Sequence, residues 1–135
     1  MKSHFPLWAL VLFGLSIFLF NLLATYWHLF FLIWWLDIPV HILSGAWVAL
    51  VMLVLYYHAD NVGRKDHTTL FVVLFALSSS LIIGLMWEVY EFVVDRAMAG
   101  SNLQLGDTLK DLCDDLVGGA AAAWIFIQNG YNKHI

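Results

Sequence analysis

Long apolar runs, separated by short polar segments, dominate the pattern of this sequence. Three of them have the roughly 20 mostly apolar residues that a bilayer-spanning helix needs: Leu7 to Thr25, Ile38 to Tyr57, and Thr69 to Val94. A fourth, Leu109 to Gln128, begins among aspartates and qualifies only if those acids can be explained. The pattern therefore predicts an all-α fold, a multi-pass transmembrane four-helix bundle with short loops.

The aromatic segment from Tyr26 to Trp35 does not fit a simple membrane span. Added to the first helix, it would give about 29 residues and a length of about 43 Å, more than the hydrocarbon core. Tyr and Trp rings settle at the membrane–water interface because they are amphipathic. We therefore expect a tilted helix end or an in-plane interfacial segment after the first helix, which could help to gather a lipid-like substrate.

Composition narrows the class of protein. Of the 135 residues, 62% are hydrophobic and 12% are charged, and a soluble domain of this size could not bury so much apolar surface. Residues 1–135 are therefore expected to form a single integral-membrane helical domain. Six basic side chains are too few for a nucleic-acid surface. The expected partners are membrane lipids, and the sequence leaves the oligomeric state open.

Positive charge favours the cytoplasmic side of a membrane. The segments that would share one side carry Lys2, Arg64, Lys65 and Lys133, whereas the opposite side carries Arg96 and Lys110. This asymmetry predicts a protein with both termini in the cytoplasm.

Acidic residues gather on one face of each of three predicted helices. Because a helix turns about 100° per residue, Asp107, Asp111 and Asp114 share one face, with Asp115 beside them. Glu88, Glu91 and Asp95 share a face of the third helix, and Asp37 lies one turn before His41 at the start of the second. Antiparallel connections bring all three faces to the same half of the membrane. We expect them to converge there.

Charge balance suggests what this cluster could hold. Eight carboxylates face only Arg96 and Lys110, and carboxylates at close range cannot all stay ionised without added positive charge. Either protons are shared or metal ions bind. Hard oxygen ligands favour Mg²⁺, Mn²⁺ or Ca²⁺, while an imidazole would also admit zinc or iron. The expected metal ligands are Asp37, His41, Glu88, Glu91, Asp107, Asp111, Asp114 and Asp115. Lys110 is expected to be a solvated lysine at a helix start.

Small residues continue the acidic faces along the helices. Ser80 and Gly84 precede Glu88 at four-residue steps, and Gly118 and Ala122 follow the aspartates. Such spacing lets membrane helices pack backbone to backbone, so the acids should point into the bundle. A faint repeat also relates DIPVHILSGAW, which begins at residue 37, to DLCDDLVGGAA, which begins at residue 111. Duplication of a two-helix unit and chance both explain it.

The motifs WEVYEF and LGDTLKDLCDDLVGGAAA resemble those of the YjdF-like proteins, an uncharacterised family of the bacterial inner membrane. The sequence is more remotely similar to the VanZ-like group. The residues that carry the resemblance are Trp87, Glu88, Glu91, Asp107, Thr108, Asp111, Asp115 and Gly118, with a looser match at Asp37 and His41. The resemblance implies a helical fold with an acidic intramembrane site in the bacterial inner membrane. It implies no reaction.

The function that these features favour is metal-assisted chemistry on an amphiphilic phosphate ester. Carboxylate-held ions would neutralise phosphate charge and activate water or a hydroxyl group, which makes a lipid or isoprenoid phosphate hydrolase or transferase the first hypothesis. Whether the protein is an enzyme stays open. One alternative is a protein that transports or handles protons or divalent cations. Another is a small membrane assembly protein whose acidic face meets a partner helix.

Overall fold

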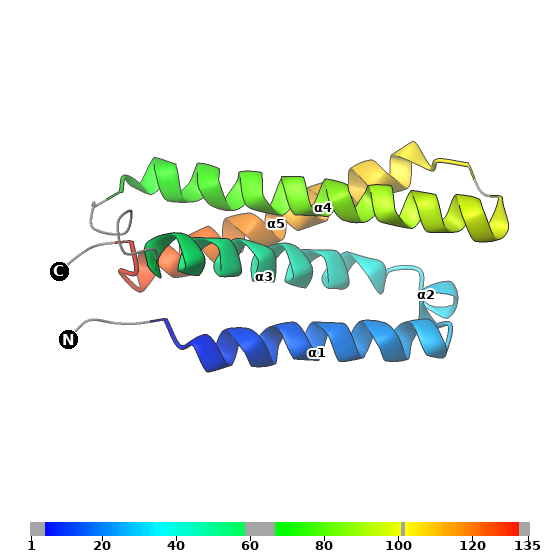
Figure 1. The fold of residues 1–135 in the computed structure, drawn as a ribbon, viewed down its shortest axis with the longest axis horizontal. Helices are drawn as coiled ribbons and strands as arrows, with labels where there is room; N and C mark the ends of the chain where they lie inside the picture. Colours follow the sequence, from blue (N-terminus) through cyan, green and yellow to red (C-terminus); the bar gives the residue numbers. More distant parts are fainter. Residues whose placement is uncertain (1–4, 59–66, 101, 133–135) are drawn as a thin grey trace.

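The computed structural model describes residues 5–58, 67–100 and 102–132, and every regular element in them is a helix (Figure 1). The elements are α1 (Leu7–Tyr26), α2 (Leu29–Leu32), α3 (Asp37–His58), α4 (Thr69–Ala99) and α5 (Leu105–Gln128). The predicted all-α class is confirmed. The predicted count of four helices is not met, because the described residues form five.

The additional helix comes from the aromatic segment. α1 ends at Tyr26, and His28 adopts a left-handed backbone conformation with φ of 55°. A non-glycine residue rarely takes this conformation, and it turns the chain so that α2 does not continue α1. The side chains of Phe31 and Trp34 are 90% and 83% exposed. The segment therefore adds nothing to the protein core, as expected of residues placed for an interface.

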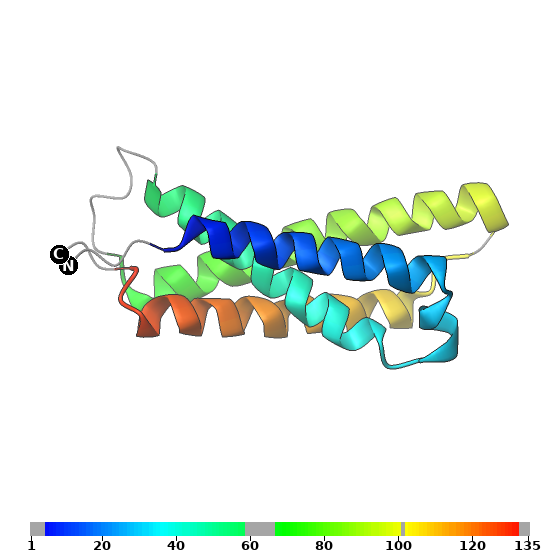
Figure 2. The same cartoon turned by 90° about the horizontal axis from the view of Figure 1, so that it is seen from below.

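The remaining four helices do not form an even bundle. α3, α4 and α5 all pack against one another, whereas α1 packs mainly on α3 (Figure 2). The indole nitrogen Nε1 of Trp47 donates a hydrogen bond of 2.9 Å to the carbonyl of Leu10, and Gly14 lies under the same ring. Only Leu10 and Ala24 of α1 are buried. The core is thus a three-helix assembly with α1 attached to one side.

Local signals set the ends of α4. Thr68 precedes the helix, and its hydroxyl accepts a hydrogen bond of 3.3 Å from the backbone N–H of Phe71, which satisfies one of the free donors at a helix start. Gly100 follows the helix in a left-handed conformation with φ of 64°, the usual way to end a helix. At the start of α3, Pro39 is tolerated because first-turn N–H groups have no helical partner.

Glycines let α3 and α5 approach each other backbone to backbone. A Cβ atom on Gly45 would overlap the backbone of Asp115, and one on Gly118 would overlap the carbonyl oxygen of Ile42 and lie 2.6 Å from the nitrogen of Ala46. From α4, the Ser80 hydroxyl donates a hydrogen bond of 2.9 Å to the carbonyl of Gly45. The predicted small-residue packing is confirmed. The two segments of the faint repeat are therefore in direct contact.

Three helices are long and apolar enough to cross a membrane: Leu7–Tyr26, Asp37–His58 and Thr69–Met98. α5 is not among them, although it packs against both α3 and α4. Away from the acidic residues, the core between these helices is mainly apolar, although Ser79 and Ser80 of α4 are also buried in it. Its most buried apolar members are Ala49, Leu53, Val72, Ala76, Ala122, Ala123 and Phe126.

Candidate functional site

The acidic segments converge at one end of the molecule. The beginnings of α3 and α5 and the end of α4 lie there together, close to α2 (Figure 1). This arrangement follows from the up-and-down course of α3, α4 and α5, and it confirms the predicted convergence. The basic residues used to orient the protein, Lys2, Arg64, Lys65 and Lys133, lie outside the described residues.

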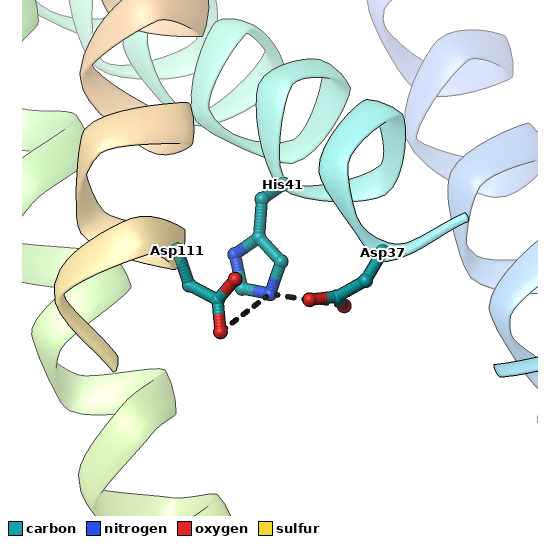
Figure 3. Close-up of side chains that lie close together, drawn as sticks. All are labelled: Asp37, His41 and Asp111. Carbon is teal, nitrogen blue, oxygen red and sulfur yellow. Dashed lines mark ion pairs between the residues drawn. The ribbon is translucent and has the colours of Figure 1, made fainter. Parts of the chain in front are cut away.

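Asp37, His41 and Asp111 form the most compact group at this end. Nε2 of His41 lies 3.5 Å from Oδ1 of Asp37 and 3.9 Å from Oδ2 of Asp111, so the imidazole stands between carboxylates of α3 and α5 (Figure 3). One ligand atom from each residue fits within 4.8 Å of the others. His41 is 7% exposed and Asp111 is 3% exposed. These three residues could hold a metal ion.

Asp115 extends this group toward α4. Its Oδ1 lies 3.4 Å from Nδ1 of His41, so both imidazole nitrogens face carboxylates. A Cβ atom on Gly84 would overlap Oδ2 of Asp115, which places this side chain against α4 one turn before Glu88. Asp115 and Glu88 are both buried. Glu88, Asp111 and Asp115 thus face into the bundle, as the small-residue pattern predicted, whereas Glu91, Asp95 and Asp107 are exposed.

Lys110 is not the solvated lysine that the sequence suggested. Its Nζ donates hydrogen bonds to Asp111 and to Oδ2 of Asp37, the latter at 2.9 Å. The same atom lies 4.0 Å from Oδ1 of Asp107 and 3.8 Å from Oδ2 of Asp114. The lysine therefore supplies an internal positive charge to the group. Helical spacing points Lys110 away from Asp111, but the long, flexible lysine side chain bends toward it. No sequence pattern predicts this contact with the neighbouring residue.

The structure divides the eight predicted ligands into two groups. Asp37, Asp111 and Asp115 surround the imidazole of His41. Asp114 lies at the edge of this group, near Lys110. The other three, together with Asp95, line a separate cleft between the end of α4 and the start of α5. The carboxylates of this cleft are Glu88, Glu91, Asp95 and Asp107. The sequence placed all of them in one pocket, because a helical wheel shows shared faces but not the distances between helices.

A family model described as "Predicted membrane protein (DUF2238)" matches residues 1–130. The chain belongs to this family. No curated protein and no solved structure matched the chain. Membership in the DUF2238 family, together with the three apolar helices, identifies an integral membrane protein. The match does not carry the YjdF-like or VanZ-like name, which stays a prediction.

Within this DUF2238 protein, the group around His41 can do two kinds of chemistry. Carboxylates and an imidazole are suitable ligands for a divalent metal ion. The same residues can also exchange protons, because His41 has a carboxylate at each ring nitrogen. Lys110 would compete with a metal ion, because its ammonium group already binds the carboxylates of Asp37 and Asp111 that the ion would need.

Proposed function

We propose that this protein binds a divalent metal ion at Asp37, His41 and Asp111 and uses it in hydrolysis or transfer of a lipid or isoprenoid phosphate. The observation that supports the proposal most is the meeting of three ligand atoms within 4.8 Å. They come from two helices that are fixed by backbone contact at Gly45 and Gly118. A site held by such rigid elements keeps its geometry, which metal binding and catalysis require.

The ion expected here is Mg²⁺, Mn²⁺ or Ca²⁺ rather than zinc or iron, because carboxylate oxygens dominate the ligand set. Lys110 must leave the group for the ion to enter. Its side chain is 38% exposed, so it can turn toward the end of the bundle. There its ammonium group would meet a substrate phosphate. A divalent ion held by Asp37, His41 and Asp111 would supply polarisation of the phosphoryl group and activation of water.

An amphiphilic substrate is favoured by the surroundings of the site. The flanks of α1 and α4 expose large apolar side chains such as Phe18, Ile82 and Met86, which suits contact with lipid tails. The aromatic segment around α2 lies at the same end as the acidic residues (Figure 1). A molecule with an apolar tail and a phosphate head would reach the site along the membrane plane.

The second candidate function is the handling of protons or divalent cations. It is favoured by the contacts of His41 and Lys110 with the surrounding carboxylates, because Lys110 already offsets part of the negative charge and an imidazole can take up or release a proton. A path across the whole membrane has less support. Among the described residues, the opposite half of the core is closed by apolar side chains such as Leu53, Val72 and Phe126. The arrangement thus favours a site that opens to one side.

For location, we propose the bacterial inner membrane with both termini in the cytoplasm. The support is the distribution of basic residues in the sequence and the resemblance of WEVYEF and the aspartate-rich segment to YjdF-like proteins. In that orientation the acidic end faces away from the cytoplasm.

Electron spin-echo spectroscopy of bound Mn²⁺ tests the proposed metal site, because it detects the nitrogen of a coordinated imidazole. The purified protein in detergent is expected to bind Mn²⁺ with this nitrogen signal, and His41→Ala is expected to lose it. His58→Ala is the matched control, since His58 is exposed at the other end of α3. A parent protein without the signal, or a signal that persists in His41→Ala, would contradict the proposed ligand set.

The reaction is tested separately with phosphatidic acid and an isoprenyl diphosphate in mixed micelles. We expect Mn²⁺-dependent release of phosphate, reduced at least about tenfold by His41→Ala and Asp111→Asn. Bound Mn²⁺ without phosphate release would reject the enzymatic role and favour the second candidate. Reconstituted vesicles that carry an internal pH or calcium indicator would then test for movement of protons or cations.

A further inference from the structure

The cleft between the end of α4 and the start of α5 is distinct from the group around His41. Its volume is about 80 Å³. Because a cavity of about 10–15 Å³ can hold one water, the cleft has room for an ion with several waters. Four carboxylates line it, together with two side-chain amides. These residues are Glu88, Glu91, Asp95, Asp107, Asn102 and Gln104.

The spacing of the acids and the turn after α4 build this cleft. Glu88, Glu91 and Asp95 are three and four residues apart, so they share one face of the helix. Gly100 reverses the chain, and the backbone N–H of Asp107 donates a hydrogen bond of 3.0 Å to the carbonyl of Gln104. This turn brings the first residues of α5 opposite the acidic face of α4.

Glu88 shows that this cleft lacks a partner for its charge. The residue is 8% exposed, and its Oε1 is buried without a hydrogen-bond partner among the described residues. A buried carboxylate oxygen without a partner is costly. Glu88 lines a cleft with three more carboxylates, where either a bound cation or a shared proton would lower this cost, and the oxygen-rich lining favours a cation.

The basic side chains do not fill this role. Within the described parts of the chain, no ion pair involves Glu88, Glu91 or Asp95. Lys110 lies 4.0 Å from Asp107 but donates its hydrogen bonds to Asp37 and Asp111. The guanidinium of Arg96, which lies next to Asp95 in the sequence, instead donates to the Gly100 carbonyl at 3.3 Å and the Asn102 side chain at 3.4 Å. Lys110 therefore offsets part of the charge at Asp107, and Arg96 lies beside Asn102, whereas the three acids of α4 have no ion-pair partner among the described residues.

We infer that the cleft formed by Glu88, Glu91, Asp95 and Asp107 is a second cation site, built for a hard divalent ion of the calcium class. Its lining offers carboxylate, amide and Thr108 hydroxyl oxygens but no imidazole or thiol. Ca²⁺ accepts six to eight oxygen ligands in flexible geometry, whereas Mg²⁺ needs a near-ideal octahedron. A cleft with several carboxylates and room for water meets the first requirement more readily. This inference does not depend on the proposed function.

Tb³⁺, a luminescent substitute for Ca²⁺, provides the test. Tryptophan transfers excitation energy to a nearby Tb³⁺ ion, and Trp87 precedes Glu88 in α4. The purified full-length protein in detergent is expected to give a saturable Tb³⁺ signal that Ca²⁺ reverses. Glu88→Gln, which keeps the side-chain shape, is expected to weaken Tb³⁺ binding about tenfold or more.

Two further variants keep the result decisive. Glu91→Gln changes an exposed member of the cleft, so it reports on binding even if Glu88→Gln does not fold. His41→Ala should leave the Tb³⁺ affinity unchanged, which separates this site from the proposed metal ion at His41. A parent protein without saturable binding would overturn the inference. So would Tb³⁺ affinity that stays unchanged in folded Glu91→Gln and in Glu88→Gln.

Discussion

The contact between α3 and α5 makes Gly118→Ala a sharp test of the fold and of the site together. The added methyl group would lie 2.6 Å from the Ala46 nitrogen, about 0.8 Å inside the 3.4 Å of an ordinary contact, and would overlap the Ile42 carbonyl. These are backbone atoms and cannot turn away as a side chain could. Overpacking a core costs about 1–3 kcal/mol, while replacing a helical glycine by alanine gains about 0.8–1 kcal/mol. Because the clash is with two backbone atoms, we take the upper end of this cost and expect a net destabilisation of about 2 kcal/mol.

The same displacement should reach the proposed metal site, because Ile42 directly follows His41. Separation of the helices would lengthen the gap between His41 Nε2 and Asp111 Oδ2, which is already 3.9 Å. Stability is measured by circular dichroism during denaturation in mixed detergent, and Mn²⁺ affinity by titration. Gly106→Ala is the matched control, since a methyl group there would meet nothing within 4 Å. Equal stability and Mn²⁺ affinity of the two variants would refute the claim that backbone contact positions the site.

Two other predictions follow from single contacts. Lys110→Gln removes the cation that competes for Asp37 and Asp111. It should tighten Mn²⁺ binding about tenfold, an effect of about 1.4 kcal/mol. A titration showing weaker or equal binding would contradict this competition. Trp47→Phe removes the 2.9 Å hydrogen bond to the Leu10 carbonyl and should destabilise the protein by about 0.5–1.5 kcal/mol, measured by the same denaturation. Since α1 contributes no residue to the group of Asp37, His41 and Asp111, Mn²⁺ affinity should not change, and a change would show that α1 supports the proposed site.

Apolar run length located the long helices well. The first run was predicted over Leu7 to Thr25, and α1 spans Leu7–Tyr26. The largest error lies at the end of α4, where the apolar run stops at Val94 but the helix continues to Ala99. Asp95 and Arg96 end the apolar pattern without ending the helix, because polar residues are compatible with helical backbone and only Gly100 supplies a stop. Helix length predicted that the aromatic segment would not simply continue the first helix, but no common breaker residue marks His28 as the turn.

The sequence predicted that the acidic residues converge at one end of the molecule, but not how they are arranged there. Helical spacing and the up-and-down connections brought the acids of three helices to one end, and the small residues indicated how closely the helices pack. The division into an imidazole-centred group and a cleft depends on how α4 and α5 cross, which periodicity does not encode. The role of Lys110 depends on the reach of a flexible side chain. Both features require the distances between helices.

The position of α5 explains how a helix with four aspartates can belong to this protein. A charged side chain near the bilayer centre costs about 2.5–3.5 kcal/mol on insertion scales, so α5 alone would insert poorly. Here Asp111 and Asp115 are 3% and 4% exposed, and His41 and Lys110 accompany them. Lys110 supplies a counter-charge from α5 itself and His41 supplies a polar partner from α3, while Gly118 and Gly119 let the helix pack closely against its neighbours. The stability of α5 in a membrane must therefore depend on α3 and α4 being in place, which a hydropathy profile of single segments cannot represent.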